Sequence, residues 1–284
     1  MPLTVTPTGA TLGAIVTGVD LEKLDEVTWA GIERAFLAHA VLIFPGQHLS
    51  DDAQIAFGRR FGRIEQLVAD REIVPIGNQR ADGTLLTDDE YGMQIMRGNE
   101  GWHTDSSYMR LAAKASVLSA HVVPPAGGET EWADMRAAYD ALDEVTRARI
   151  ANLAAYHSLH YSQSRIGHKA AVGSSYGFHN DTPPLRPLVK VHPDTHRRSL
   201  FIGRHAYGIP GLAPDESEKL LDGLVTFACQ PPRTYKHAWQ PGDIVVWDNR
   251  CVLHRARPFD HSEPRVMRHT RIAGEPASEL AIAS

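Results

Sequence analysis

Short strand-like runs from residue 115 onward constrain the fold more than any other feature of the sequence. Each run is apolar or β-branched and is bounded by proline, glycine or aspartate, a pattern typical of strands. The runs are Ala115 to Val123, Leu188 to His192, Ser199 to Gly203, Asp243 to Trp247 and Arg265 to Ile272. Long insertions separate them, and no glycine-rich loop leads from a strand into a helix. The sequence therefore favours a β-sandwich or barrel over a doubly wound nucleotide-binding sheet.

Amphipathic segments predict helices around this sheet. Asp25 to Ala40 carries its large apolar residues at helical spacing, and Val41 to Phe44 follows as a short apolar strand. Ser50 can cap a second helix, which Gly62 ends. Further helices are expected at Asp134 to Leu142, Glu144 to Ala155 and Pro214 to Phe227. The predicted fold class is therefore mainly β with flanking helices.

The length of 284 residues allows one large domain or two small ones. No low-complexity segment or flexible linker divides the chain, so we expect a single domain over residues 1–284. The stretch from Tyr161 to Pro187 is rich in serine, glycine, histidine and proline and has little periodicity. We therefore expect an inserted loop or lid at about residues 157–187.

Charge and cysteine content narrow the classes of partner. The formal charge is −5 and no run of five like charges occurs, which argues against nucleic acid and membrane surfaces and favours a small-molecule ligand. With only Cys229 and Cys251, the chain cannot build a disulfide framework, which fits a reducing compartment. No signal sequence is evident, and no apolar stretch approaches the ~20 residues of a membrane helix. We expect a cytoplasmic protein and leave a homo-oligomer open.

The motif His-x-Asp occurs three times, at His103-Thr-Asp105, His179-Asn-Asp181 and His192-Pro-Asp194. The last two lie in turn-like surroundings with proline nearby. The first differs, because two side chains separated by one residue in an extended segment point to the same side and can hold one ion together.

A third metal ligand must come from elsewhere in the chain, and His254 is the candidate. It is distant in sequence but reachable if the strands close into a barrel. Two histidines and a carboxylate form the facial arrangement that binds Fe(II) and leaves positions open for substrate and oxygen. The same set suits zinc, so a zinc-dependent hydrolase is an alternative of another class. A non-catalytic binding module is a third hypothesis, against which the complete ligand set argues.

Two further residues weigh against the hydrolase. Arg265, eleven residues after His254, could bind the far carboxylate of a dicarboxylate co-substrate in a bidentate manner. Thr130, which follows Gly127-Gly128-Glu129, could add a hydroxyl group to the same carboxylate. A zinc hydrolase would leave both side chains without a role.

Four segments together carry a family resemblance. They are Trp102-His-Thr-Asp-Ser-Ser-Tyr108, Val123-Pro-Pro-Ala-Gly-Gly-Glu-Thr130, Asp134-Met-Arg-Ala-Ala-Tyr-Asp-Ala-Leu142, and Trp247-Asp-Asn-Arg-Cys-Val-Leu-His254 with Arg265. They resemble the Fe(II)/2-oxoglutarate-dependent dioxygenases of the taurine and 2,4-dichlorophenoxyacetate dioxygenase family. The likeness runs from about Thr4 to Gly274. It is strongest to the aryloxyalkanoate dioxygenases that act on (S)-phenoxypropionates, which share the segment from His157 to Ser164.

The resemblance implies a double-stranded β-helix, the jelly-roll or cupin-like fold. It implies that His103, Asp105 and His254 are the catalytic metal ligands and that Thr130 and Arg265 bind 2-oxoglutarate. Asn99 falls where relatives contact the substrate or co-substrate, although an ordinary turn residue is an equal alternative there.

One position departs from the family pattern. Fifteen residues after the last metal histidine, relatives carry an arginine for the substrate anion, whereas this chain has His269. On a regular strand, His269 and Arg271 share the face of Arg265. We therefore expect Arg271 to bind the substrate anion with help from His269, and Arg268 to face solvent. A β-bulge would exchange these roles.

The implied reaction requires Fe(II), 2-oxoglutarate and O2 and hydroxylates the carbon next to the ether oxygen of an aryloxyalkanoate. The substrate would be a small aromatic anion such as 2,4-dichlorophenoxyacetate or (S)-dichlorprop, and the products would be a phenol, a 2-oxo acid, succinate and CO2. Tyr108, His160 or Tyr161 would line the aryl pocket. The same chemistry on a sulfonate such as taurine, an alkyl sulfate or another small anion is the alternative.

Overall fold

A seven-stranded sheet forms the centre of the computed structural model, which describes residues 2–174, 176–179 and 182–282. Its strand order is β1-β2-β3-β13-β5-β15-β4. The bounds are β1 (Thr4–Pro7), β2 (Ala14–Thr17), β3 (Val41–Phe44), β13 (Ile244–Asp248), β5 (Ala113–Val122), β15 (Val266–Ala273) and β4 (Val74–Gly77). Most neighbours are antiparallel, while β2 and β3 run parallel.

The other strands of the described residues form three smaller sheets. A three-stranded sheet has the order β12-β6-β14, a second has the order β11-β7-β8, and β10 pairs with β9. The bounds are β6 (Thr130–Asp134), β12 (Thr234–His237), β14 (Val252–Ala256), β7 (Ala154–His157), β8 (Leu185–Pro187), β9 (Val189–Val191), β10 (Arg198–Leu200) and β11 (Ala206–Tyr207).

The central strand β13 shows why a layer packs on each face of the large sheet. Ile244 and Val246 belong to the apolar cluster formed with the first helices of the chain, whereas Val245 and Trp247 belong to the cluster formed with β6 and β14. Alternate strand residues point to opposite faces, so both faces of β13 are buried. Trp132 of β6 packs against Trp247 with ring centroids 5.8 Å apart, which places the β12-β6-β14 sheet against the large one.

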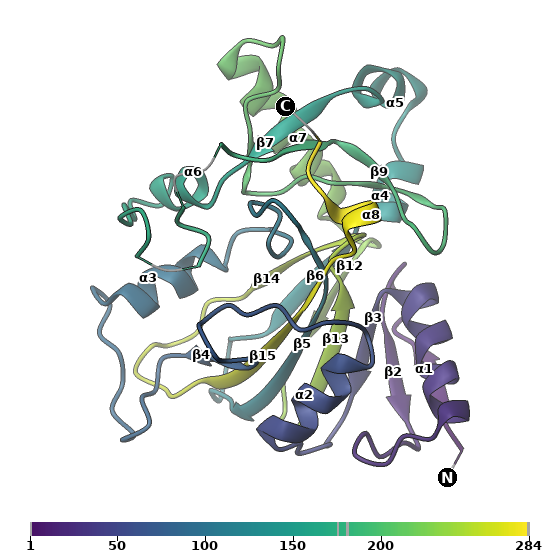
Figure 1. Ribbon diagram of the computed structural model, residues 1–284, viewed down its shortest axis with the longest axis vertical. Coiled ribbons are helices and arrows are strands. Elements are labelled where there is room, and N and C mark those ends of the chain that lie inside the picture. The colour runs from purple at the N-terminus through teal and green to yellow at the C-terminus, as the bar shows by residue number, and fades with distance from the viewer. Residues whose placement is uncertain (1, 175, 180–181, 283–284) are drawn as a thin grey trace.

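Helices cover the outer faces of these sheets (Figure 1). The predicted first two helices are confirmed as α1 (Glu26–His39), capped by Asp25, and α2 (Asp51–Arg59), capped by Ser50. The others are α3 (Tyr91–Gly98), α4 (Met135–Asp140), α5 (Glu144–Ile150), α6 (Leu159–Ser164), α7 (Pro214–Ala228) and α8 (Pro276–Glu279). Among the described residues, no helix combines the length and apolar character needed to cross a membrane.

Two predicted segments differ from the structure. The helix expected from residue 144 to 155 ends at Ile150, because residues 154–157 form β7 and pair with β8 and β11. The insertion expected at residues 157–187 contains α6, and its residues 175, 180 and 181 lie outside the described part of the chain. Its function as a lid stays a prediction.

Candidate metal centre

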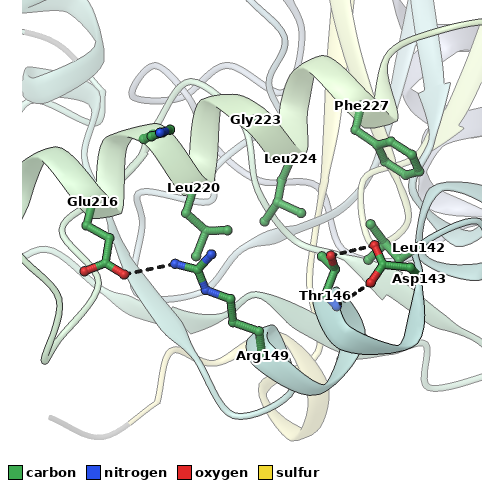
Figure 2. A pocket seen from close by; sticks show the side chains of 10 residues that line it. Leu142, Asp143, Thr146, Arg149, Glu216, Leu220, Gly223, Leu224 and Phe227 are labelled. Carbon is green, nitrogen blue, oxygen red and sulfur yellow. Dashed lines mark hydrogen bonds and ion pairs between the residues drawn. The ribbon is translucent and has the colours of Figure 1, made fainter.

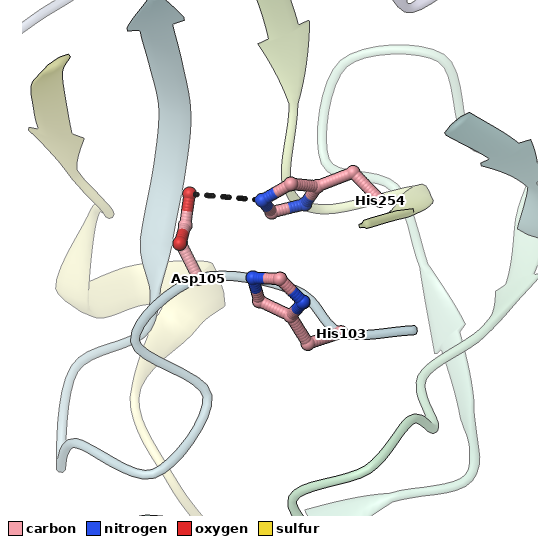
Figure 3. Close-up of side chains that lie close together, drawn as sticks. All are labelled: His103, Asp105 and His254. Atoms are coloured by element: carbon pink, nitrogen blue, oxygen red, sulfur yellow. Dashed lines mark ion pairs between the residues drawn. The ribbon is translucent and has the colours of Figure 1, made fainter. Parts of the chain in front are cut away.

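Backbone pairing brings two distant histidines together. His103 N–H donates to His254 O at 3.0 Å, and His254 N–H donates to His103 O at 2.7 Å, which forms an isolated antiparallel bridge. His254 lies in β14, and Asp105 follows His103 by two residues. One potential ligand atom from each of the three side chains lies within 4.8 Å of the others. Figure 3 shows the three side chains pointing toward one another.

The local conformation around Asp105 differs from the extended segment expected from the sequence. Only His103 takes part in a bridge, and residues 105–108 form turns in which Ser106 has a φ of 52°. Thr104 Oγ1 donates to Asn249 O at 2.7 Å and ties this turn to the segment after β13. A turn, rather than the pleat of a strand, therefore brings the carboxylate toward the imidazoles.

Burial keeps both histidines neutral, as metal ligation requires. Removal from solvent lowers the pKa of His103 to about 3 and that of His254 to about 4. His103 Nδ1 lies 2.7 Å from Gly101 O, so this nitrogen carries the proton and leaves the Nε2 lone pair free. Burial alone would raise the pKa of Asp105, but the positive charge of Arg271 and the three neighbouring imidazoles together outweigh that effect and hold the pKa well below its usual range.

These donors fit a divalent metal ion. The three residues are 6–7% exposed and offer two neutral imidazoles and one carboxylate at one point. Nδ1 of His254 is buried without a hydrogen-bond partner, and His254 Nε2 lies 3.8 Å from Asp105 Oδ2. Two histidines and one carboxylate with open positions beside them form the ligand set typical of non-haem Fe(II) oxygenases.

A small inner cavity of about 70 Å³ adjoins this group, and Thr130 and Arg265 line it. Arg265 is 4% exposed, and its guanidinium donates to Gly128 O from Nε at 3.2 Å and from Nη2 at 3.0 Å. Within the described residues no carboxylate pairs with it, and burial lowers its pKa to about 10. Thr130 Oγ1 accepts a hydrogen bond from Trp239 Nε1 at 3.0 Å, which leaves its own proton for another acceptor. The cavity therefore offers a buried cation and a hydroxyl donor to an anion.

The three residues expected to contact the substrate also line the inner cavity: Asn99, His269 and Arg271. Arg271 Nη2 donates to Asp105 Oδ1 at 2.9 Å, and Arg271 Nη1 donates to Ser106 Oγ at 3.0 Å. His269 is 3% exposed and neither of its ring nitrogens has a hydrogen-bond partner. Arg268 instead lies beside Asp51 with its side chain 29% exposed. The alternation expected along this strand is therefore observed.

A larger outer cavity of about 350 Å³ shares His103, Asp105 and Asn99 with the inner one. Much of its lining is apolar, including Leu67, Val68, Ile76, Ile95, Met96 and Leu159. Arg204 also lines it and was not predicted from the sequence. Its Nη1 donates to Gly98 O and its Nη2 to Ser162 O at 2.7 Å.

Arg204 is a second cation without a counter-charge. No carboxylate in the described part of the chain pairs with it, and burial lowers its pKa to about 10. A Cβ added at Gly98 would lie 2.6 Å from Arg204 Nη1, so the glycine makes room for the guanidinium. In the sequence, Arg204 stands out only as an arginine directly after the strand expected at Ser199 to Gly203, which is a weak signal.

The three residues expected to line the aryl pocket, Tyr108, His160 and Tyr161, lie in different places in the structure. Tyr108 lines the outer cavity, and His160 lines a neighbouring hollow of about 340 Å³ that shares Tyr108 and Leu159 with it. The prediction for Tyr161 is wrong, because this residue stacks on Tyr207 with ring centroids 4.6 Å apart. Leu159 and Gln163 occupy the buried face of α6, and Tyr161 lies on another face of that helix.

Among the described residues, the His192-Pro-Asp194 motif is not part of this centre. His192 Nδ1 accepts from the backbone N–H groups of Asp194 and Thr195, which confirms the predicted turn, and Asp181 lies outside the described residues. His192, Asp248 and Cys251 also lie close together. However, Arg250 and His192 already hydrogen-bond the Asp248 carboxylate, so its oxygens have protein partners.

A hollow on the outside of the molecule lies between α5 and α7 (Figure 2). Leu220, Leu224 and Phe227 of α7 form its apolar floor, and an ion pair between Arg149 and Glu216 spans it at 2.9 Å. Both members of this ion pair are about half exposed. The metal-ligand candidates therefore lie in a different part of the molecule from this hollow.

A sheet-rich fold that encloses a buried His-Asp-His group beside an unpaired arginine is typical of metal-dependent oxygenases. Comparison with known proteins defines the family: the chain belongs to the taurine catabolism dioxygenase TauD, TfdA family, which matches residues 4–271. The predicted family membership and the enzyme class, an alpha-ketoglutarate-dependent dioxygenase, are confirmed.

Individual relatives are similar over nearly their whole length. The (S)-phenoxypropionate/alpha-ketoglutarate-dioxygenase of Sphingobium herbicidovorans is 56% identical and covers 98% of both chains. The alpha-ketoglutarate-dependent 2,4-dichlorophenoxyacetate dioxygenase of Cupriavidus pinatubonensis is 40% identical over 94% of this chain and 96% of its own. A crystal structure of AAD-2 in complex with Mn(II) and N-oxalylglycine matches with a TM-score of 0.91 and 38% identity over 100% of both chains.

Proposed function

We propose that this enzyme hydroxylates aryloxyalkanoates at the carbon next to the ether oxygen. It uses Fe(II), 2-oxoglutarate (alpha-ketoglutarate) and O2, as the donor set and the alpha-ketoglutarate-dependent relatives support. His103, Asp105 and His254 hold the metal. Thr130 and Arg265 bind the far carboxylate of 2-oxoglutarate in the inner cavity, because a buried, unpaired guanidinium and a free hydroxyl proton suit an anion there.

The chain's own residues bind, orient and shield the reactants. An Fe(II) ion bound there, together with 2-oxoglutarate and O2, supplies the oxidising power that replaces a C–H bond with C–OH and releases succinate and CO2. The hydroxylated substrate is a hemiacetal or hemiketal, which collapses to a phenol and a 2-oxo acid. Burial of the three ligands keeps solvent from the reacting carbon, and the protein contributes placement and exclusion of water.

The lining of the outer cavity is the observation that most supports an aryloxyalkanoate substrate. Its apolar lining suits an aryl ring, and Arg204 gives it a half-buried positive charge for the carboxylate of the same molecule. Arg271 and His269, predicted for this anion, lie on the side toward Asp105, where the charge of Arg271 is shared with that carboxylate. We therefore assign the substrate carboxylate mainly to Arg204, with Arg271, His269 and Asn99 as the polar wall next to the metal.

The proposed fold class is the double-stranded β-helix. The packing of the β12-β6-β14 sheet against the seven-stranded sheet supports it, because His254 comes from the first sheet while Arg265 and His269 accompany β15 of the second. Residues of both sheets therefore line the inner cavity. Both cysteines are free, which agrees with a cytoplasmic location.

The experiment that tests this function is a succinate-release screen with purified protein, Fe(II), 2-oxoglutarate and air. The (S)- and (R)-enantiomers of an aryloxypropionate, 2,4-dichlorophenoxyacetate, taurine and a linear alkyl sulfate are compared, and phenol release is measured in parallel. We expect succinate and phenol in equal amounts with an aryloxyalkanoate. Faster succinate release with taurine or the alkyl sulfate would contradict the substrate assignment while leaving the oxygenase chemistry intact.

A further inference from the structure

Both oxygens of the Asp105 carboxylate have buried hydrogen-bond donors. Ser116 Oγ lies 2.6 Å from Asp105 Oδ2, and Arg271 Nη2 lies 2.9 Å from Asp105 Oδ1. Ser116 belongs to β5, which is neither the strand of His254 nor the turn of Asp105, and it is 0% exposed. The carboxylate is therefore fixed from two sides.

The direction of the contact from Ser116 follows from a chain of three hydrogen bonds. An indole nitrogen can only donate, so Trp247 Nε1, at 3.0 Å, identifies Oδ1 of Asn249 as an acceptor. The other amide atom of Asn249 is then Nδ2, which donates to Ser116 Oγ at 2.9 Å. Since Ser116 accepts from Asn249, its own proton points to Asp105 Oδ2.

The same chain contacts other parts of the centre. Asn249 O accepts from Thr104 Oγ1 at 2.7 Å, which holds the segment between His103 and Asp105. The ring of Trp247 lies 4.7 Å from that of His254 and stacks on His269 at 6.1 Å with an interplanar angle of 6°. Asn249 is 1% exposed, so these contacts are made away from solvent.

We infer that Ser116 and Asn249 are positioning residues that hold Asp105 as a one-oxygen ligand, with Oδ2 turned toward the imidazoles. His254 Nε2 and His269 Nε2 each lie 3.8 Å from this same oxygen. Partners that orient a metal ligand typically contribute about 10- to 100-fold to metal affinity. The inference rests on the proposed metal site, and it goes beyond it by assigning a function to two residues that touch neither metal nor substrate.

The test compares two buried serines of β5, of which only Ser116 contacts Asp105. Ser116→Ala removes the donor to Asp105, whereas Ser119→Ala removes an equally buried hydroxyl that donates to Gln54 Oε1 at 2.6 Å. Free Mn(II) is titrated into each metal-free protein and followed by electron paramagnetic resonance, with no substrate or co-substrate present. We expect Ser116→Ala to weaken Mn(II) binding by about 10- to 100-fold and Ser119→Ala to change it by less than about 2-fold.

Asn249→Asp provides a second variant if Ser116→Ala does not fold. It keeps an acceptor for Trp247 but replaces the Nδ2 donor with an oxygen, which draws the Ser116 proton away from Asp105. We expect weaker Mn(II) binding together with an altered spectrum of the bound ion. A merely structural contribution would lower the thermal midpoint of the metal-free protein and leave both readouts unchanged.

The outcomes separate the two claims. Wild-type affinity in Ser116→Ala or in Asn249→Asp would overturn the positioning inference and leave the metal site standing. Failure of the wild-type protein itself to bind Mn(II) would overturn the proposed function and the inference with it.

Discussion

Arg271 donates a hydrogen bond of 2.9 Å to Oδ1 of Asp105, the carboxylate placed to hold the metal. The side chains of Arg271 and Asp105 are 9% and 7% exposed, so the two opposite charges are buried together and balance each other. A buried ion that loses its partner costs about 3–5 kcal/mol. In the metal-free enzyme, the Arg271 guanidinium therefore supplies the positive charge that balances the Asp105 carboxylate.

Replacing this arginine tests that relationship. We expect Arg271→Gln to lower the free energy of unfolding of the metal-free protein by about 3 kcal/mol, because Asp105 is left as an unpaired buried carboxylate. A divalent ion restores the missing positive charge, so Mn(II) should stabilise the variant more than it stabilises the wild type. Urea denaturation with and without Mn(II) measures both effects. An equal loss of stability in the two conditions would contradict this account.

Arg265 should determine affinity for 2-oxoglutarate and not for the metal. Its guanidinium faces the inner cavity without a carboxylate partner in the described residues, and each charge-assisted hydrogen bond contributes about 1.5–3 kcal/mol. We expect Arg265→Gln to raise KM for 2-oxoglutarate by about 10- to 100-fold and to leave Mn(II) binding unchanged. Arg268→Gln, three residues further along the chain in β15, is the matched control, because Arg268 lies beside Asp51 and lines neither cavity. A similar KM effect in both variants would show that general loss of positive charge is responsible.

Arg204 should act on the substrate alone. It lines the outer cavity but does not line the inner one, so its loss removes a partner of the substrate carboxylate while the co-substrate site stays intact. We expect Arg204→Gln to raise KM for an (S)-aryloxypropionate by about 10-fold or more, with KM for 2-oxoglutarate within a factor of about two. Steady-state kinetics with each reactant varied separately distinguish the two constants. Unchanged substrate KM would return the anion to Arg271 and His269.

Buried neutral imidazoles should make stability fall in acid. Burial lowers the pKa of His157 and of His269 to about 3 and that of His205 well below its ordinary value of 6.5. Above about pH 6.5 these groups are neutral in folded and unfolded chains alike; below it only the unfolded chain binds protons, so stability is lost as pH falls toward the folded pKa values. Each such imidazole contributes about 1.4 kcal/mol per pH unit in that range.

Urea denaturation of the metal-free protein between about pH 7.5 and 5 measures this slope. His157→Phe removes one titrating group whose ring lies 5.7 Å from Phe201, so the slope should decrease by about one proton. A slope identical to that of the wild type would contradict the low pKa of His157.

The sequence predicted correctly those helices and strands whose capping residues or apolar residues are informative within the segment itself. Asp25 and Ser50 cap the first two helices, and the apolar run at residues 41–44 is buried on both faces. The helix predicted from residue 144 to 155 extended into the first two residues of β7, because the strand character of β7 comes only from pairing with β8 and β11. Such pairing depends on residues far away in the sequence and leaves no periodic pattern in a four-residue strand.

The site residues also divide into those that the sequence alone reveals and those that only the folded chain reveals. His103, Asp105 and His254 were found because their residue types and motif context are informative before any geometry is known. Ser116 and Arg204 were not found, since a serine in a strand and an arginine after one are ordinary residues. Their importance depends on distances to Asp105 and to the outer cavity, which only the folded chain provides.

The most direct test of the central claim is anaerobic titration of the metal-free enzyme with Fe(II) in excess 2-oxoglutarate, followed by visible absorption. We expect a weak charge-transfer band that saturates at one Fe(II) per chain and that His254→Ala abolishes. No band in the wild-type enzyme, or an undiminished band in His254→Ala, would contradict a centre built from His103, Asp105 and His254.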